Sequence, residues 1–152
     1  MVSLKSVGEG LQVLTSVVSA CGIFFAARQL GFSKAQAETA FEDSLAREYR
    51  ELAQGLPTSA LLGESLEAEA QLQSLDEFFH YIDMSNEQVF LRMEGRVRRS
   101  TWKNWCAGIQ SNLSKPAFRH AWDDVSKRNP DSFSELRRLI TSNFAEDPRT
   151  WH

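Results

Sequence analysis

Glu77 and His80 are the two residues whose types and spacing come nearest to metal or acid–base chemistry. They form an E-x-x-H pattern, whose two side chains share one face of a helix. Dinuclear metal sites in helical bundles use two such pairs plus two further carboxylates. No second pair exists here, because Ala117 stands three residues before His120. Glu87 extends the acidic face, so a weak surface cation site or an enzyme built on these groups is a minor hypothesis. Hydrogen bonding of His80 within the fold is favoured.

Other chemical arrangements are incomplete. Some helical ribonucleases carry an arginine a few residues before a histidine, but neither His80 nor His120 has an arginine five to seven residues before it. Cys106 lies among tryptophans with no histidine nearby in sequence, which is typical of a packing residue rather than a nucleophile. Gly8-Glu9-Gly10 lacks the third glycine and the preceding strand of a phosphate-binding loop. We therefore expect no enzymatic activity, no cofactor and no resident metal.

The segment GRVRRSTWKNW, residues 95–105, interleaves basic and tryptophan side chains. Its bases form a candidate surface for lipid headgroups or a partner protein, namely Arg96, Arg98, Arg99 and Lys103. The favoured alternative places Trp102 and Trp105 in the core and leaves the bases as a solvated rim paired with an acidic helix. Nucleic acid is not expected as the main partner, because the net charge is −3.

Acidic and basic residues are segregated along the chain. Residues 64–95 carry eight acidic residues against one arginine, whereas residues 96–143 carry ten basic residues against four acidic ones. The favoured interpretation is that the two stretches pack together in one domain and partly neutralise each other. Alternatively, the basic half faces anionic lipid, where each Lys or Arg near the surface contributes about 1 kcal/mol.

The N-terminal residues from Gly10 to Ala27 carry no charge, and Leu11 to Ala27 would form about 25 Å of helix. That length is near the lower limit for a hydrocarbon core of about 30 Å. Three interpretations compete: a membrane span, a bacterial lipoprotein signal ending at Val18-Ser19-Ala20-Cys21, and a buried soluble helix. The apolar run continues past Cys21, where a lipoprotein would have a polar tether. A membrane span is therefore favoured.

The charges that flank this run predict its orientation. One base precedes it and three follow it, namely Lys5 and then Arg28, Lys34 and Arg47. The positive-inside rule then places the C-terminal domain in the cytoplasm and the N-terminus outside. The two cysteines are far apart in sequence and fit a reducing compartment. We expect the chain at a bacterial inner membrane.

Small and polar residues recur along one face of the predicted span, at alternating spacings of four and three. The residues of this oligomer face, which could also line a pore, are Gln12, Thr15, Ser19, Gly22, Ala26 and Gln29. In lipid, small side chains let helices approach closely, and polar ones bond across the contact. Chance in a weakly hydrophobic helix is the alternative, but homo-oligomerisation is favoured.

The rest of the chain predicts only helices. Ser33 has capping-box spacing, so a second helix begins there or the first continues, and Gly55-Leu56-Pro57 ends it. Residues 66–94 predict the longest soluble helix, stopped by Gly95, and Ser100 should cap the next one. Ser114, with Pro116 two residues on, should start another helix, and a last one starts at residue 131 or 132.

No segment alternates as a strand would, so the expected class is all-α, with an N-terminal transmembrane helix followed by a cytoplasmic helical bundle. The expected domains are an N-terminal tail and transmembrane helix over residues 1–32, a cytoplasmic helical domain over 33–143, and a C-terminal tail over 144–152. Within the long helix, Asn86 has poor helix propensity and should have a specific partner, with Arg96 and Arg99 as candidates.

Several stretches of the chain resemble a group of small uncharacterised bacterial proteins, each with one N-terminal membrane helix and a cytoplasmic helical domain. The stretches are FEDSLAREYREL, ALLGE, YIDMSNEQVFLRMEGRV, TWKNWCAGIQSNL, PAFRHAWDDV and FSELRRLI. The resemblance covers nearly all of the chain after residue 27. It implies the layout of an anchor and a helical domain, and it assigns no site residues.

The sequence thus predicts a bacterial single-pass membrane protein that associates with itself and with the lipid bilayer. The first functional hypothesis is a non-enzymatic pore-like or membrane-perturbing effector in bacterial stress or antiviral defence. The second is a membrane-tethered adaptor that recruits a cytoplasmic protein through its charged helical domain.

Overall fold

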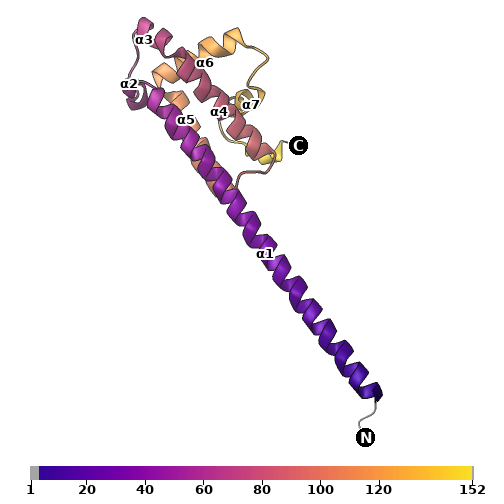
Figure 1. Cartoon of the computed structure of the whole chain (residues 1–152). Coiled ribbons are helices and arrows are strands. Elements are labelled where there is room, and N and C mark those ends of the chain that lie inside the picture. The colour runs from indigo at the N-terminus through magenta and orange to yellow at the C-terminus, as the bar shows by residue number, and fades with distance from the viewer. Residues whose placement is uncertain (1–3, 152) are drawn as a thin grey trace. The chain divides into compact units, whose positions relative to one another are not determined.

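The computed structural model describes the backbone of residues 4–151 and the side chains of residues 24–151. Every regular element in this range is helical, which confirms the predicted all-α class (Figure 1). The elements are α1 (Leu4–Gly55), α2 (Thr58–Leu62), α3 (Ala68–Gln73), α4 (Leu75–Met93), α5 (Arg99–Ser114), α6 (Pro116–Arg128), α7 (Ser134–Thr141) and the short 3₁₀ helix η1 (Pro148–Thr150).

The chain divides into two units, Met1–Phe41 and Glu42–His152, and α1 contributes to both. No helix starts at Ser33, because α1 continues through it and ends at Gly55, before Pro57 as predicted. Among the described residues, none of the helices combines the length and the apolar character needed to cross a membrane. The predicted span from Leu11 to Ala27 lies largely outside the residues whose side chains are described.

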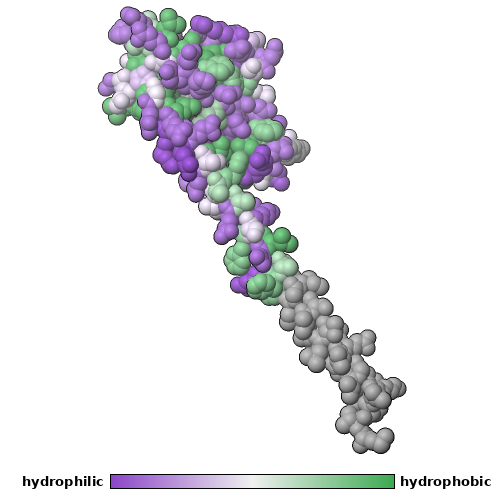
Figure 2. All heavy atoms as spheres, viewed as in Figure 1, coloured by the Kyte–Doolittle hydropathy of each residue, from purple (hydrophilic) through white to green (hydrophobic). Residues whose placement is uncertain are grey.

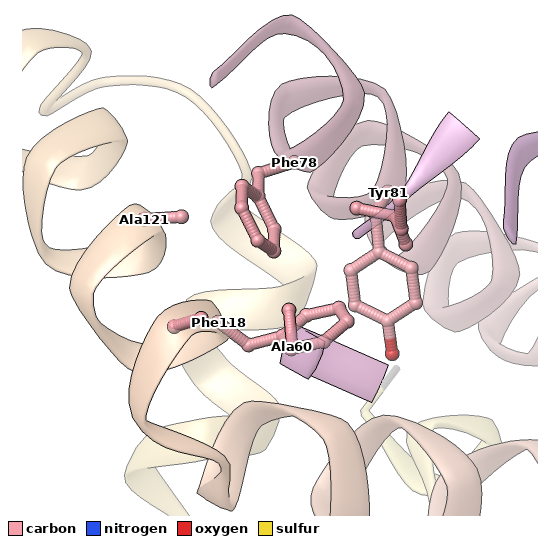
Figure 3. Close-up of a cluster of buried hydrophobic side chains, with 7 residues drawn as sticks. Ala60, Phe78, Tyr81, Phe118 and Ala121 are labelled. Carbon is pink, nitrogen blue, oxygen red and sulfur yellow. The ribbon is translucent and has the colours of Figure 1, made fainter. Parts of the chain in front are cut away.

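Helix α4 is the centre of the second unit and contacts α3, α5, α6, α7 and η1. Its Phe78 ring meets the Phe118 ring of α6 edge to face, with centroids 5.0 Å apart (Figure 3). The Tyr81 ring also packs edge to face on the Phe118 ring, with centroids 5.0 Å apart. Fully buried Ala60 and Ala121 complete the group, since small side chains let the backbones of α2 and α6 come close. This aromatic cluster fixes α4 against α6.

The single helix predicted over residues 66–94 is wrong, because the chain breaks at Ser74 into α3 and α4. Ser74 adopts φ −99° and ψ 12°, outside the helical region. The Gln71 amide donates to the Ala117 carbonyl of α6 at 3.0 Å, so α3 is held to α6. Serine is less favourable than alanine or leucine inside a helix, so a helix break at Ser74 costs little.

Helix α4 ends as predicted before Gly95, which has φ +72°. The amide of Arg96 bonds the Leu91 carbonyl and that of Gly95 bonds the Arg92 carbonyl, which is a Schellman motif with glycine in the left-handed position. A Cβ on Gly95 would lie 2.5 Å from Cζ of Arg149. Glycine is therefore required by the left-handed turn, whereas the guanidinium of Arg149 is the end of a flexible side chain and could move aside.

Asn86 of α4 has its partner in α7 and not in the expected Arg96 or Arg99. Its side-chain oxygen accepts from the backbone N–H of Leu136 at 3.0 Å. The N-cap residue of α7 is Phe133, whose side chain cannot accept a hydrogen bond and whose φ is +59°. Asn86 therefore caps α7 from a neighbouring helix, and α7 starts at Ser134 rather than at residue 131 or 132.

We expect Asn86→Ala to lower the free energy of unfolding by about 1 kcal/mol, the usual cost of losing an N-cap acceptor. Asn86→Asp is the matched control, because it keeps the acceptor and adds a charge that a helix N-terminus favours. Urea unfolding of both variants measures the difference. Equal stability of Asn86→Ala and the unmodified chain would contradict the capping role.

Candidate functional site

The predicted oligomer face is only partly visible. Its members Gln12, Thr15, Ser19 and Gly22 lie outside the residues whose side chains are described. Ala26 and Gln29 are exposed on α1. Large apolar side chains are exposed beside them, and Figure 2 shows this apolar surface on α1 within the first unit. They are Phe24 (69% exposed), Phe25 (69%), Leu30 (71%) and Phe32 (60%).

The residues of the predicted basic surface differ in their contacts. Arg98 pairs with Glu42 of α1, through Nε at 3.0 Å, through Nη2 and through its backbone N–H at 2.9 Å. Trp102 is buried as expected. Arg96, Arg99 and Lys103 are exposed, and the last two line a hollow of about 330 Å³ beside Cys106 and the C-terminal segment. All four bases are exposed, and Arg98 is in addition engaged by Glu42.

Glu42 caps the start of α5, which the sequence assigned to Ser100. The N-cap residue is Arg98, and Glu42 accepts from its backbone N–H and from Thr101 Oγ1 at 2.8 Å. Burial raises the pKa of Glu42, but the hydrogen bonds from Arg98 and Thr101 outweigh it and hold the pKa below its ordinary value. Glu42 is thus a buried carboxylate that ties α1 to α5.

Glu77, His80 and Glu87 share a broad acidic hollow of about 370 Å³ with Glu48, Glu51 and Asp83. Oε2 of Glu77 is buried and has no hydrogen-bond partner. No group of three or more His, Cys, Asp or Glu residues in the described part of the chain is arranged to hold a metal ion. The hollow brings the predicted residues together, and its acidic lining gives the unit a negative face.

A second cavity, of about 350 Å³, lies between the α1, α4 and α5 segments of the second unit. We call it the α1/α4/α5 cavity. Its lining is Ala46, Tyr49, Arg50, Tyr81, Met84, Ser85, Gln88, Asn104, Trp105, Gly108, Ile109 and Asn112. Such a mainly apolar wall with a few placed polar groups is typical of small-molecule sites.

Asn112 organises the polar part of this wall. Its Nδ2 donates to the hydroxyls of Tyr49 at 3.3 Å and Tyr81 at 3.1 Å, and its Oδ1 accepts from Lys115 Nζ at 2.7 Å. Both hydroxyls accept from the amide, so each keeps its own proton to donate. Burial raises the pKa of Tyr81 to about 12, so its hydroxyl stays protonated at neutral pH.

Two further features of the α1/α4/α5 cavity are unusual for a helical core. Gln88 is only 6% exposed, and its amide makes no hydrogen bond to any residue that the structure describes. Gly108 stands in the middle of α5, and a Cβ built on it would meet no atom within 4 Å. Sequence reasoning missed this site. Its only signals were a glutamine on an otherwise buried helix face and a glycine within a helical pattern.

No family model, curated protein sequence or solved structure matches the chain. The chain's own residues therefore carry any inference about function. They present two distinct surfaces, the exposed apolar part of α1 in the first unit and the α1/α4/α5 cavity in the second.

Proposed function

We propose that the chain is a non-enzymatic, membrane-anchored helical protein that self-associates through α1, with the unit Glu42–His152 on the cytoplasmic side. One observation carries the proposal: an uncharged run from Gly10 to Ala27 lies within the continuous helix α1, ends with the exposed Phe24 and Phe25, and is followed by the exposed Leu30 and Phe32. Clustered apolar side chains exposed on a helix mark a surface for lipid or for another helix. The resemblance to small membrane-anchored bacterial proteins supports the same layout.

Self-association is proposed from the oligomer face. Its small members would allow close approach of two helices in lipid, and its glutamine, serine and threonine side chains would bond across the contact. An assembly of this kind would perturb or perforate a bilayer, because polar side chains facing one another inside lipid attract water. We propose on this basis a role as a membrane-perturbing effector, in bacterial stress or antiviral defence.

The test uses the full chain expressed in bacteria. We expect it to resist extraction of membranes with alkaline carbonate and to be cross-linked as an oligomer in mild detergent. Gly22→Leu should abolish the cross-linked oligomer but keep membrane retention, because it adds bulk to the oligomer face while raising apolar character. Val17→Leu, on the opposite side of the helix from the oligomer face, is the matched control and should leave the oligomer intact.

Release of the chain by carbonate would overturn the membrane anchor. A monomer at micromolar concentration, unchanged by Gly22→Leu, would overturn self-association. Escape of a trapped dye from liposomes carrying the unmodified chain, but not from liposomes carrying Gly22→Leu, separates a membrane-perturbing assembly from a simple anchor.

The adaptor hypothesis has one specific observation in its favour, the acidic hollow with exposed Glu48, Glu51, Asp83 and Glu87. Concentrated negative charge attracts a basic partner and weakens as salt screens it. Salt-sensitive co-purification of one partner with a monomeric, membrane-bound chain would favour the adaptor over the self-associating effector.

A further inference from the structure

We propose that the α1/α4/α5 cavity binds a purine nucleotide, a planar heterocycle whose edge pairs with Gln88 and whose phosphate faces Arg50. The proposal goes beyond membrane anchoring and does not depend on it, because every residue that lines the cavity belongs to the second unit. The volume of about 350 Å³ is within the range for small-molecule sites.

Gln88 is the observation that points to a ligand. The residue is 6% exposed and lines the cavity, and its amide makes no hydrogen bond to a described residue. The amide is not among the side-chain groups sealed from solvent without a partner, so it faces the water of the cavity. A ligand that reproduces the hydrogen bonds of such water can take its place at little cost. A glutamine amide offers an N–H donor beside a carbonyl acceptor, which is the pattern that pairs in two bonds with a purine edge. A ligand with an adjacent acceptor and donor would therefore fit the Gln88 amide.

The walls select a flat ring. Tyr49, Tyr81 and Trp105 line the cavity together with Met84 and Ile109. Bases stack on aromatic side chains with about 1–3 kcal/mol per base. The Tyr49 and Tyr81 rings are tilted by 61° and are held by Asn112, so the wall is built before a ligand arrives.

The charge at the mouth selects an anion. Arg50 is exposed and is the one charged residue in the lining, and no carboxylate lines the cavity. Gln88 and Tyr81 are buried, whereas Arg50 and Asn104 are exposed, so the ring would lie inward and the phosphate outward. Arginine forms paired hydrogen bonds with phosphate oxygens.

Gly108 keeps the space open. Glycine within a helix lowers stability relative to alanine, yet nothing near Gly108 requires the absence of a Cβ. A side chain at this position would instead extend beside the cavity that Gly108 lines. Gly108 is exposed, so a larger side chain there would narrow the open side of the cavity.

The experiment is isothermal titration calorimetry of the full chain in detergent with adenosine 5′-monophosphate and guanosine 5′-monophosphate. We expect saturable binding of at least one nucleotide. Gly108→Leu, which fills the cavity, and Gln88→Leu, which removes the amide, should each weaken it about tenfold or more. Ser111→Leu, an exposed position on the same helix that lines no cavity described above, should leave the affinity unchanged.

Thermal unfolding of the same variants separates loss of binding from loss of fold. Gln88→Leu should unfold at about the same temperature, because the amide that it removes makes no hydrogen bond to a described residue. Adenosine should bind about tenfold more weakly than its monophosphate, and Arg50→Gln should remove that difference. Arg50 is exposed, so its substitution should not affect folding.

Three results would overturn the proposal. They are the absence of saturable binding of either nucleotide up to millimolar concentration, binding that Gly108→Leu and Gln88→Leu leave unchanged, and equal affinity for adenosine and its monophosphate. Equal affinity for 2-naphthoate, which is flat and anionic but has no hydrogen-bonding ring edge, would also contradict recognition through Gln88.

Discussion

Arg98→Ala should lower the free energy of unfolding at pH 7 by about 3 kcal/mol, more than Glu42→Ala does. The reason is the unequal burial of the two partners, since the side chain of Glu42 is 6% exposed and that of Arg98 is 47% exposed. Removing the arginine leaves a buried carboxylate with only the backbone N–H at position 98 and Thr101 as donors. Removing the glutamate leaves an arginine that water can reach, so about 2 kcal/mol is expected.

Protonation of Glu42 sets an upper limit on the free energy of unfolding that Arg98→Ala can lose. A carboxyl of ordinary pKa can be neutralised at pH 7 for about 3.5 kcal/mol, since each pKa unit is worth about 1.4 kcal/mol. The expected loss of stability in Arg98→Ala is therefore slightly smaller than the free energy needed to protonate Glu42 at pH 7. Chemical denaturation of both single variants and of the double variant gives the coupling energy between the two side chains.

The pH dependence of stability provides a second measurement on the same pair. In the unmodified chain the lowered pKa of Glu42 contributes stability above the ordinary value of 4.5, and this is lost as the pH falls through the folded-state pKa. Burial, the largest influence on this group, raises its pKa. Arg98→Ala should therefore lose the part of the acid sensitivity that Glu42 contributes. The same acid sensitivity in both proteins would show that the pair does not hold α5 to α1.

The sequence predicted local features of the fold well. Gly55-Leu56-Pro57, Gly95 and Pro116 end or start helices where expected, because glycine and proline act through the backbone of their own residues. It failed where a helix end depends on a distant side chain. Glu42, and not the predicted Ser100, caps the start of α5. The start of α7 depends on Asn86, which lies 50 residues before Leu136 and accepts a hydrogen bond from its backbone N–H.

The candidate sites show the same division. The acidic hollow was partly predictable, because Glu77, His80, Asp83 and Glu87 come from successive turns of one helix. The α1/α4/α5 cavity was not, because its volume depends on how three helix segments pack. Only the packing shows that the Gln88 amide has no partner and that Gly108 leaves open space.

Asp147→Ala should destabilise the second unit by about 2–3 kcal/mol and release the C-terminal segment from α4. Asp147 accepts from Arg92 through Nε at 2.8 Å and Nη2 at 2.6 Å, and Arg92 also donates to the Val97 carbonyl at 2.8 Å. The Arg92 side chain is 9% exposed, so losing Asp147 leaves a buried guanidinium with one acceptor. Arg92→Met combined with Asp147→Ala should recover part of the loss, because no unpaired charge stays buried.

Acid should produce the same release in the unmodified chain. The hydrogen bond from Arg92 holds the pKa of Asp147 below its ordinary value of 3.8, so its stabilising contribution is present above that pH and is lost as the pH falls through the lower folded-state pKa. Circular dichroism of the unmodified chain and of Asp147→Ala between pH 5 and 2 compares the two. Asp147→Ala should show a shallower decline, because the titrating group has been removed.

The reactivity of Cys106 measures, at neutral pH, the release of the C-terminal segment in Asp147→Ala. It lines the hollow that Phe144 to Asp147 close, and its pKa is raised by burial and by the negative charge of Asp147. Release of the segment removes both effects, so more thiolate forms and reagents reach the sulfur more easily. In a Cys21→Ser background, Asp147→Ala should react several-fold faster with Ellman's reagent. Unchanged reactivity together with unchanged stability would mean that the Arg92–Asp147 pair contributes no more than an exposed ion pair does.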